Sequence, residues 1–274
     1  MKTAKILFVY CLIQTGLLAQ FYYPNSIDYG KPSDLGLPYK NIYFDSADGT
    51  TLHGWLIKGE GNKGTIIHFH GNAQNMSSHF HGISWLAKEG FDIFVFDYRG
   101  YGKSKGNPTR AGVFLDCDAA VKKAFELQSD KDTFLLFGQS LGAANALALI
   151  GEKKYDKIKG VIAEASFYSY KSIARDKAGA IANFFISDKN SPHLVIDKIS
   201  PIPILFAHGT ADEVVPYKHS KALYDMAKEP KEFLSSNGAG HLAVFSSTRA
   251  GNRKQLIETI TRWIEADGVS DATL

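Results

Sequence analysis

Residues 138–142, Gly-Gln-Ser-Leu-Gly, have the types and spacing needed for nucleophilic chemistry. They follow an apolar run at 134–137 and precede a run of mostly small residues at 143–149. This context predicts a buried strand that turns sharply into a helix, with Ser140 in a strained backbone conformation at the turn. Gly138 and Gly142 would remove side chains that such a turn cannot hold. Ser140 is therefore the candidate nucleophile, although a glycine-rich turn with Ser140 as helix N-cap is an alternative.

A serine nucleophile needs a base, and the base needs an orienting acid. In an open parallel sheet such groups gather after the carboxyl ends of strands. Asp212 follows the strand-like run 204–207, and His241 lies in a glycine-flanked loop before the last helical stretch. Each residue alone is typical of an ordinary turn or loop, and Glu213 is the neighbouring alternative acid. The order Ser140, Asp212, His241 nevertheless matches one known arrangement of a catalytic triad.

The run 65–70 leads into a loop that contains Gly71, Asn72 and Ala73. In enzymes with this triad order, one oxyanion-hole N–H comes from such a loop and the other from the residue after the nucleophile. The spacing predicts the backbone N–H groups of Asn72 and Leu141 for these roles. Ala73 remains the alternative to Asn72.

The histidine pattern does not indicate a metal site. His68 and His70 alternate on one predicted strand, but no nearby residue completes a ligand set, and His79 and His81 would point in different directions on a helix. The chain also lacks a G-x-G-x-x-G motif and a phosphate loop. We expect neither a metal nor another cofactor.

Strand and helix patterns alternate along the chain, which predicts a mostly parallel sheet with helices on both faces. Residues 41–44 and 51–57 read as a hairpin, because Asp48-Gly49 lies between them. Helical stretches are expected near 77–89, 110–128, 141–151, 169–186, 218–228 and 252–265. Further strands are expected at 65–70, 93–96, 134–137, 160–162, 204–207 and 232–234, which makes eight.

The first residues differ from the rest of the chain. Lys2 and Lys5 precede an apolar stretch of about fourteen residues, the length of a signal-peptide core. We expect residues 1–19 to be a signal peptide or N-terminal anchor, residues 20–40 a connector and residues 41–274 one catalytic domain. The protein would then be exported, to a periplasm or the medium, or anchored in a membrane. The formal net charge of +3 and the absence of a basic run give no indication of nucleic-acid binding.

These motifs resemble the α/β-hydrolase superfamily. The resemblance extends over roughly residues 21–265 and rests on residues 70–73 (HGNA), 96–104 (FDYRGYGKS), 138–142, 208–212 (HGTAD) and 240–241. It is closest to the small membrane-associated abhydrolase-domain branch, which includes depalmitoylases and serine aminopeptidase-like proteins. That branch often has Arg where this chain has Gln139. The resemblance implies nucleophile, acid and base roles for Ser140, Asp212 and His241.

The segment between Ser166 and Pro192 is too short for a closed cap, so we expect a short lid with one aromatic-rich helix over an open, apolar-walled cleft. Asp97 and Arg99 would fix a loop rather than touch substrate. Asp176 and Asp188 look isolated and solvated, so no acidic pair is available to hold a charged amino terminus. The predicted function is a serine hydrolase of carboxylic esters or thioesters, with a small-molecule or acylated substrate. A serine peptidase and a non-catalytic binding module are the alternatives.

Overall fold

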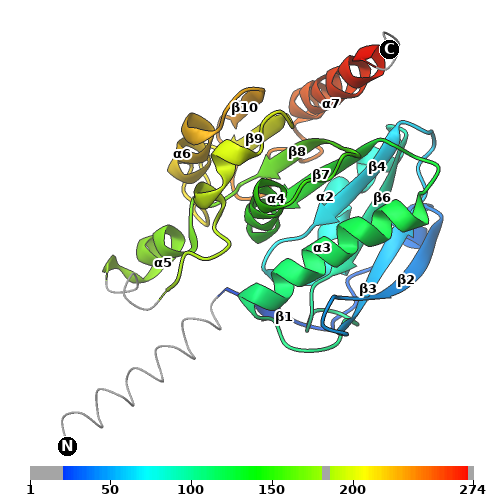
Figure 1. The fold of residues 1–274 in the computed structure, drawn as a ribbon, viewed down its shortest axis with the longest axis horizontal. Helices are drawn as coiled ribbons and strands as arrows, with labels where there is room; N and C mark the ends of the chain where they lie inside the picture. Colours follow the sequence, from blue (N-terminus) through cyan, green and yellow to red (C-terminus); the bar gives the residue numbers. More distant parts are fainter. Residues whose placement is uncertain (1–20, 181–185, 271–274) are drawn as a thin grey trace, which may run out of the picture.

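The structure, a computed structural model, describes residues 21–180 and 186–270, with side chains through residue 266. Its main strands are β2 Tyr39–Asp45, β3 Thr51–Ile57, β4 Gly64–Phe69, β6 Phe91–Asp97, β7 Phe134–Gln139, β8 Ile158–Glu164, β9 Ile204–Gly209 and β10 Lys231–Ser236. They form one eight-stranded sheet in the order β10-β9-β8-β7-β4-β6-β3-β2 (Figure 1). In this sheet β3 runs in the opposite direction to the other strands, which are parallel to one another. The expected fold class is therefore confirmed.

Side chains that alternate along the strands supply two cores, one on each face of the sheet. Ile67 and Phe69 of β4 pack toward α3 Arg110–Leu127, α4 Leu141–Glu152 and α6 Lys218–Met226. Ile66 packs on the other side, with α2 Met76–Ile83 and α7 Ala250–Ser270. Because helices cover both faces, the central strands are continuous apolar runs. Cys117 of α3 is buried in the first of these cores.

The connector carries an element that the sequence pattern did not predict. Residues Tyr23–Pro24 form a short strand, β1, which pairs in parallel with β5 Ala73–Gln74. The Tyr23 N–H donates to the Asn72 carbonyl at 2.8 Å, and the Asn75 amide donates to the Ile27 carbonyl at 2.8 Å. These bonds attach the connector to the loop that follows β4.

Helix α5, Tyr170–Ala178, projects away from the sheet (Figure 1). It is shorter than the expected 169–186, because Gly179 adopts a left-handed φ of 80° that ends it. Of the aromatic residues in the segment between Ser166 and Pro192, Phe167 and Tyr168 precede this helix, Tyr170 begins it, and residues 184 and 185 lie outside the described residues.

The predicted signal or anchor at 1–19 also lies outside the described residues. In the part of the chain that the structure describes, no helix is long and apolar enough to cross a bilayer.

Candidate active site

Ser140 occupies the turn between the end of β7 and the start of α4. Its φ of 54° and ψ of −114° are unusual for a residue with a side chain, and conformations of this kind cost about 1–3 kcal/mol. The turn is held on both sides, because the Ser140 N–H donates to the Glu164 carbonyl at 2.8 Å and the Ala144 N–H donates to the Ser140 carbonyl at 3.1 Å. The strained turn predicted from the sequence is present.

The two glycines around Ser140 are required by space. A Cβ on Gly142 would lie 1.9 Å from the Phe69 carbonyl oxygen, and one on Gly138 would lie 2.4 Å from the Ala143 Cα. Both obstacles are backbone atoms, which cannot rotate away as a side chain can. The structure thus gives the physical reason for the spacing of the motif.

Asp212 and His241 are brought together from separate loops. His241 Nδ1 lies 2.8 Å from Asp212 Oδ2, while Asp212 Oδ1 accepts the N–H groups of Val214 and Val215, each at 2.8 Å. Burial opposes ionisation of this carboxyl, but hydrogen bonds from His208 and His241 outweigh it and hold the pKa of Asp212 below its ordinary value. Asp212, rather than Glu213, is therefore the acidic residue that is hydrogen-bonded to His241.

The ring of His241 leaves its Nε2 for another partner, because Nδ1 faces Asp212. Ser140 is buried, and the His241 side chain is 19% exposed. Among the described residues, no hydrogen bond joins the Ser140 hydroxyl to His241. Such contacts are often long in substrate-free enzymes and shorten when substrate binds.

A buried hydrogen-bond network joins the serine turn to the His241 loop. Gln139 accepts from His68 Nε2 at 3.0 Å and donates from its own Nε2 to Glu164 at 2.8 Å. Glu164 then accepts the Val244 N–H at 3.1 Å. Burial raises the pKa of Glu164. The sequence analysis did not identify Glu164 as part of the site. Its one indication in the sequence is the polar residue Gln139 inside the nucleophile motif, whose side chain needs a buried partner.

A pocket of about 290 Å³ opens over Ser140. The rest of its lining is Phe21, Tyr23, Asn72, Leu141, Phe167, Ile173, Ala174, Lys177, Ala178, Val214 and Val215. Asn72 and Leu141, the predicted oxyanion donors, thus both face the pocket, and Ala73 is not part of its lining. The Tyr101 hydroxyl donates to the Asn72 carbonyl at 2.7 Å, which helps to fix this loop.

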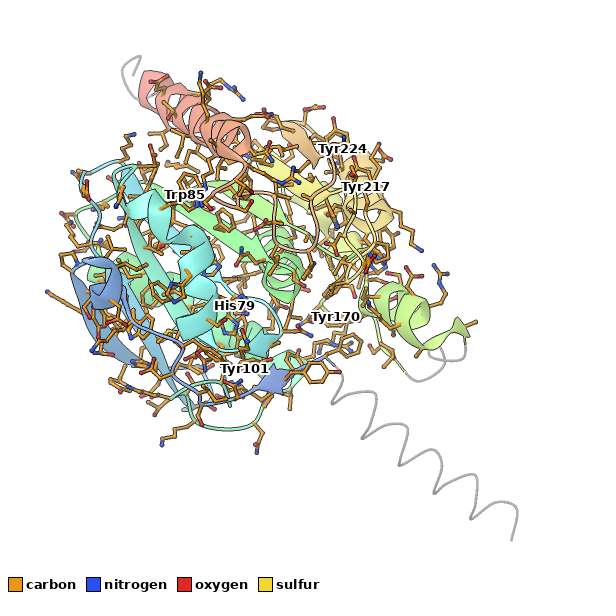
Figure 2. The ribbon with its side chains drawn as sticks, turned by 180° about the vertical axis from the view of Figure 1, so that it is seen from behind. His79, Trp85, Tyr101, Tyr170, Tyr217 and Tyr224 are labelled. Atoms are coloured by element: carbon orange, nitrogen blue, oxygen red, sulfur yellow. The ribbon has the colours of Figure 1, made fainter. Side chains whose placement is uncertain are left out.

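The pocket wall contains aromatic residues that sequence analysis did not assign to the site. The Phe21 ring packs edge-on against Tyr170, with ring centroids 5.1 Å apart. Figure 2 shows Tyr170 at the start of α5. Phe21 and Tyr23 are more than a hundred residues from Ser140, so no local spacing could have indicated their place in the wall.

Two acidic residues are not isolated, contrary to the expectation. Asp176 lies 2.7 Å from Lys218 Nζ and 2.9 Å from His219 Nε2, which joins α5 to α6. Asp188 accepts the Lys171 N–H at 2.9 Å and so supports the start of α5. Pairing between segments distant in sequence explains both corrections.

Arg99 has the structural role expected of it. Its guanidinium lies 2.8 Å from Asp116 and 2.7 Å from Asp48, which ties the loop after β6 to the β2–β3 turn. Asp97 accepts the Met76 N–H at 2.7 Å. Both side chains hold loops together.

The histidines considered as metal ligands contact protein groups instead. His68 bonds Gln139, and His70 Nδ1 lies 2.7 Å from the Gly71 carbonyl. His79 stacks on His70 and bonds the Ala73 carbonyl at 3.0 Å. In residues 21–180 and 186–270, no group of three His, Cys, Asp or Glu side chains is arranged to hold a metal.

Residues 60–193 match the family model described as serine aminopeptidase, S33. The chain is 38% identical to the uncharacterized protein YfhR of Escherichia coli K12, over 94% of this chain and 95% of that protein. It is 34% identical to the α/β hydrolase domain-containing protein WAV2 of Arabidopsis thaliana, over 72% of this chain and 69% of that protein.

Solved structures share the fold at lower sequence identity. An esterase of Pyrococcus furiosus superposes with a TM-score of 0.74 and 23% identity, over 89% of this chain and 99% of that one. The strand order, the strained serine turn and these relatives agree, and the chain belongs to the α/β-hydrolase superfamily.

Proposed function

We propose that this protein is a serine hydrolase that cleaves carboxylic esters or thioesters through an acyl-enzyme. The observation that carries the proposal is the strained Ser140 in the pocket lining, together with an Asp212–His241 hydrogen bond of 2.8 Å. Core packing does not require this combination. It supplies a nucleophile, a base and an acid that keeps the base oriented.

In the proposed mechanism, Ser140 Oγ attacks the carbonyl carbon while His241 Nε2 accepts the hydroxyl proton. Asp212 stabilises the imidazolium that forms. The N–H groups of Asn72 and Leu141 stabilise the developing oxyanion. His241 then protonates the leaving group, and water releases the acyl group from Ser140 by the reverse sequence of proton transfers.

The walls favour an acyl substrate over a peptide. Phe21, Phe167 and Ile173 offer apolar surface, and each buried CH₂ of an acyl chain contributes roughly 0.8 kcal/mol. No carboxylate occurs among the described residues that line the pocket. An aminopeptidase would need such a charge to hold the substrate's ammonium group, so the peptidase alternative implied by the family description receives less support.

The test is a panel of p-nitrophenyl esters of rising chain length beside aminoacyl p-nitroanilides, with a fluorophosphonate probe to report an active serine. We expect kcat/KM for the esters to exceed that for every anilide, and the probe to label Ser140. A preferred anilide would replace this proposal with the peptidase alternative. A protein that neither labels nor turns over any substrate would favour the non-catalytic binding module.

We also propose that residues 1–19 direct export or anchor the protein in a membrane. The support is the pair of lysines ahead of the apolar stretch. Mass spectrometry of the native protein should find an N-terminus near Gln20 in the exported fraction, or the full chain in membranes. Full-length protein confined to the soluble cytoplasmic fraction would contradict both forms of the proposal.

A further inference from the structure

We infer that the pocket over Ser140 selects esters that carry an anionic group, and that Lys177 recognises this group. The inference rests on the proposed function and adds a substrate class to it. Among the described residues that line the pocket, Lys177 alone carries a charge. All the others are apolar, aromatic or neutral polar side chains. The pocket therefore presents apolar walls with a single cation.

A hydrogen bond to a neighbouring loop positions the Lys177 side chain at the pocket. It lies near the end of α5, and its Nζ donates to the Glu213 carbonyl at 3.2 Å, next to Asp212. A lysine ammonium has three N–H donors, so two remain for a ligand. The hydrogen bond holds the cation at the pocket without neutralising it, because a carbonyl carries no net charge.

The nearest acidic side chain on the same helix is already paired. Asp176 lies 2.7 Å from Lys218 and 2.9 Å from His219. Lys177 itself forms no ion pair within the described part of the chain, and the Glu213 carboxylate is not part of the pocket lining. The positive charge of Lys177 is therefore available to a substrate.

This arrangement has opposite consequences for two classes of substrate. A carboxylate or sulfonate on the ester would gain an ion pair at the edge of an apolar site, while an ammonium group would be repelled. Because Lys177 is exposed, solvent weakens the attraction, and we expect a preference of roughly 5-fold, as for a good exposed ion pair. The preference should shrink as salt is added.

The experiment compares esters matched in length that differ in charge. Mono-p-nitrophenyl adipate beside p-nitrophenyl hexanoate places the anion on the acyl chain. The hexanoyl ester of 4-hydroxybenzoate beside that of 4-hydroxybenzamide places it on the alcohol. Each pair is measured with the natural protein, Lys177→Gln, Lys177→Arg and Lys171→Gln. Lys171 is a control on the same helix whose side chain does not line the pocket.

We expect one anionic ester to be preferred roughly 5-fold in kcat/KM at low salt, and the favoured pair identifies the side that carries the anion. Lys177→Gln should lower the ratio of kcat/KM between the anionic and the neutral ester to about 1. Lys177→Arg and Lys171→Gln should keep the preference. Equal rates for both pairs, or a preference that survives Lys177→Gln, would overturn the inference while the proposed function stands.

A binding measurement separates the inference from the proposed function. Calorimetry with Ser140→Ala compares adipic acid monoamide, a carboxylate, with neutral hexanamide. If no ester is hydrolysed but the carboxylate binds more tightly in a manner lost with Lys177→Gln, the inference stands and the hydrolase proposal fails. Equal binding of the two compounds, without ester hydrolysis, would contradict both.

Discussion

Ser140 and Asn72 reach the pocket from the central strands of the sheet, whereas Phe21 and Lys177 reach it from segments outside the sheet. The first group, which we call the floor (Ser140, Leu141 and Asn72), is set by backbone geometry. The second, which we call the roof (Phe21, Tyr23, Ile173 and Lys177), is held by side-chain contacts and by the short pairing of β1 with β5. The difference indicates that the fold fixes where chemistry happens, while peripheral side chains decide what is bound.

Burial and contacts support this contrast. At the floor, added atoms on Gly142 would meet backbone at 1.9 Å, so little variation is possible. At the roof, the stabilising contacts are aromatic and ionic, such as the Arg110 guanidinium 4.0 Å from the centre of the Tyr170 ring. Contacts of this kind can change one residue at a time without disturbing the sheet.

The largest expected effect comes from Ser140→Ala at the floor. Removal of the nucleophile should lower kcat roughly 10⁴-fold or more, while ligand binding under the roof persists. Steady-state kinetics, probe labelling and calorimetry report these effects separately. A variant that retains most of its activity and still reacts with the probe would show that another residue is the nucleophile.

Asp212→Asn should have the second largest effect, a loss of about 10³- to 10⁴-fold in kcat. The amide can still accept an N–H bond from Val215, but it no longer stabilises the charged His241 ring. Glu213→Gln is the matched control and should stay near the natural rate, because in the described part of the chain the hydrogen bond and ion pair of His241 are with Asp212 and not with Glu213. If the Glu213 variant loses activity and the Asp212 variant retains it, the acid has been assigned to the wrong residue.

Phe21→Ala tests the roof. The variant loses an edge-on contact with Tyr170, and such pairs are worth about 0.5–1.5 kcal/mol. We expect KM for a medium-chain ester to rise roughly 2- to 10-fold, with kcat changed less than about twofold. Tyr43→Ala on the edge strand β2 is the control, because Tyr43 is 58% exposed. A large fall in kcat without a change in KM would mean that the roof also takes part in the chemistry.

The smallest effect on activity is expected at Asp97, which belongs to neither the floor nor the roof. Burial raises the pKa of Asp97 to about 7. The folded protein therefore keeps this proton from about pH 4 to 7, while the unfolded chain releases it near ~3.9. The contribution of Asp97 to stability is fully present below the unfolded pKa and is lost as pH rises toward 7.

Asp97→Asn should remove this dependence. Burial lowers the pKa of the neighbouring His70. The contribution of His70 to stability therefore increases as pH rises, and it is present in both proteins. The test is therefore the difference between the two proteins in free energy of unfolding, from urea titrations at pH 5, 6 and 7. As pH rises from 5 to 7, the free energy of unfolding of the variant should increase relative to that of the natural protein. A difference that stays constant with pH would contradict the raised pKa of Asp97.

Local pattern in the sequence determined much of this protein. All eight main strands were predicted, because their apolar runs and turn residues are local signals. The prominence of Ser140, Asp212 and His241 came from motifs at strand ends, where an open parallel sheet gathers its functional groups. The glycines at 138 and 142 could be interpreted in advance because a sharp turn excludes side chains there.

Only the tertiary structure decided the surroundings of these residues. The pairing of β1 with β5, the place of Phe21 in the pocket wall and the Asp176–His219 contact each join segments more than 40 residues apart. The same holds for Glu164, which reaches the His241 loop through a hydrogen bond across 80 residues. Spacing in a sequence reports neighbours along one strand or helix, but it carries no information on which distant side chains meet once the sheet has formed.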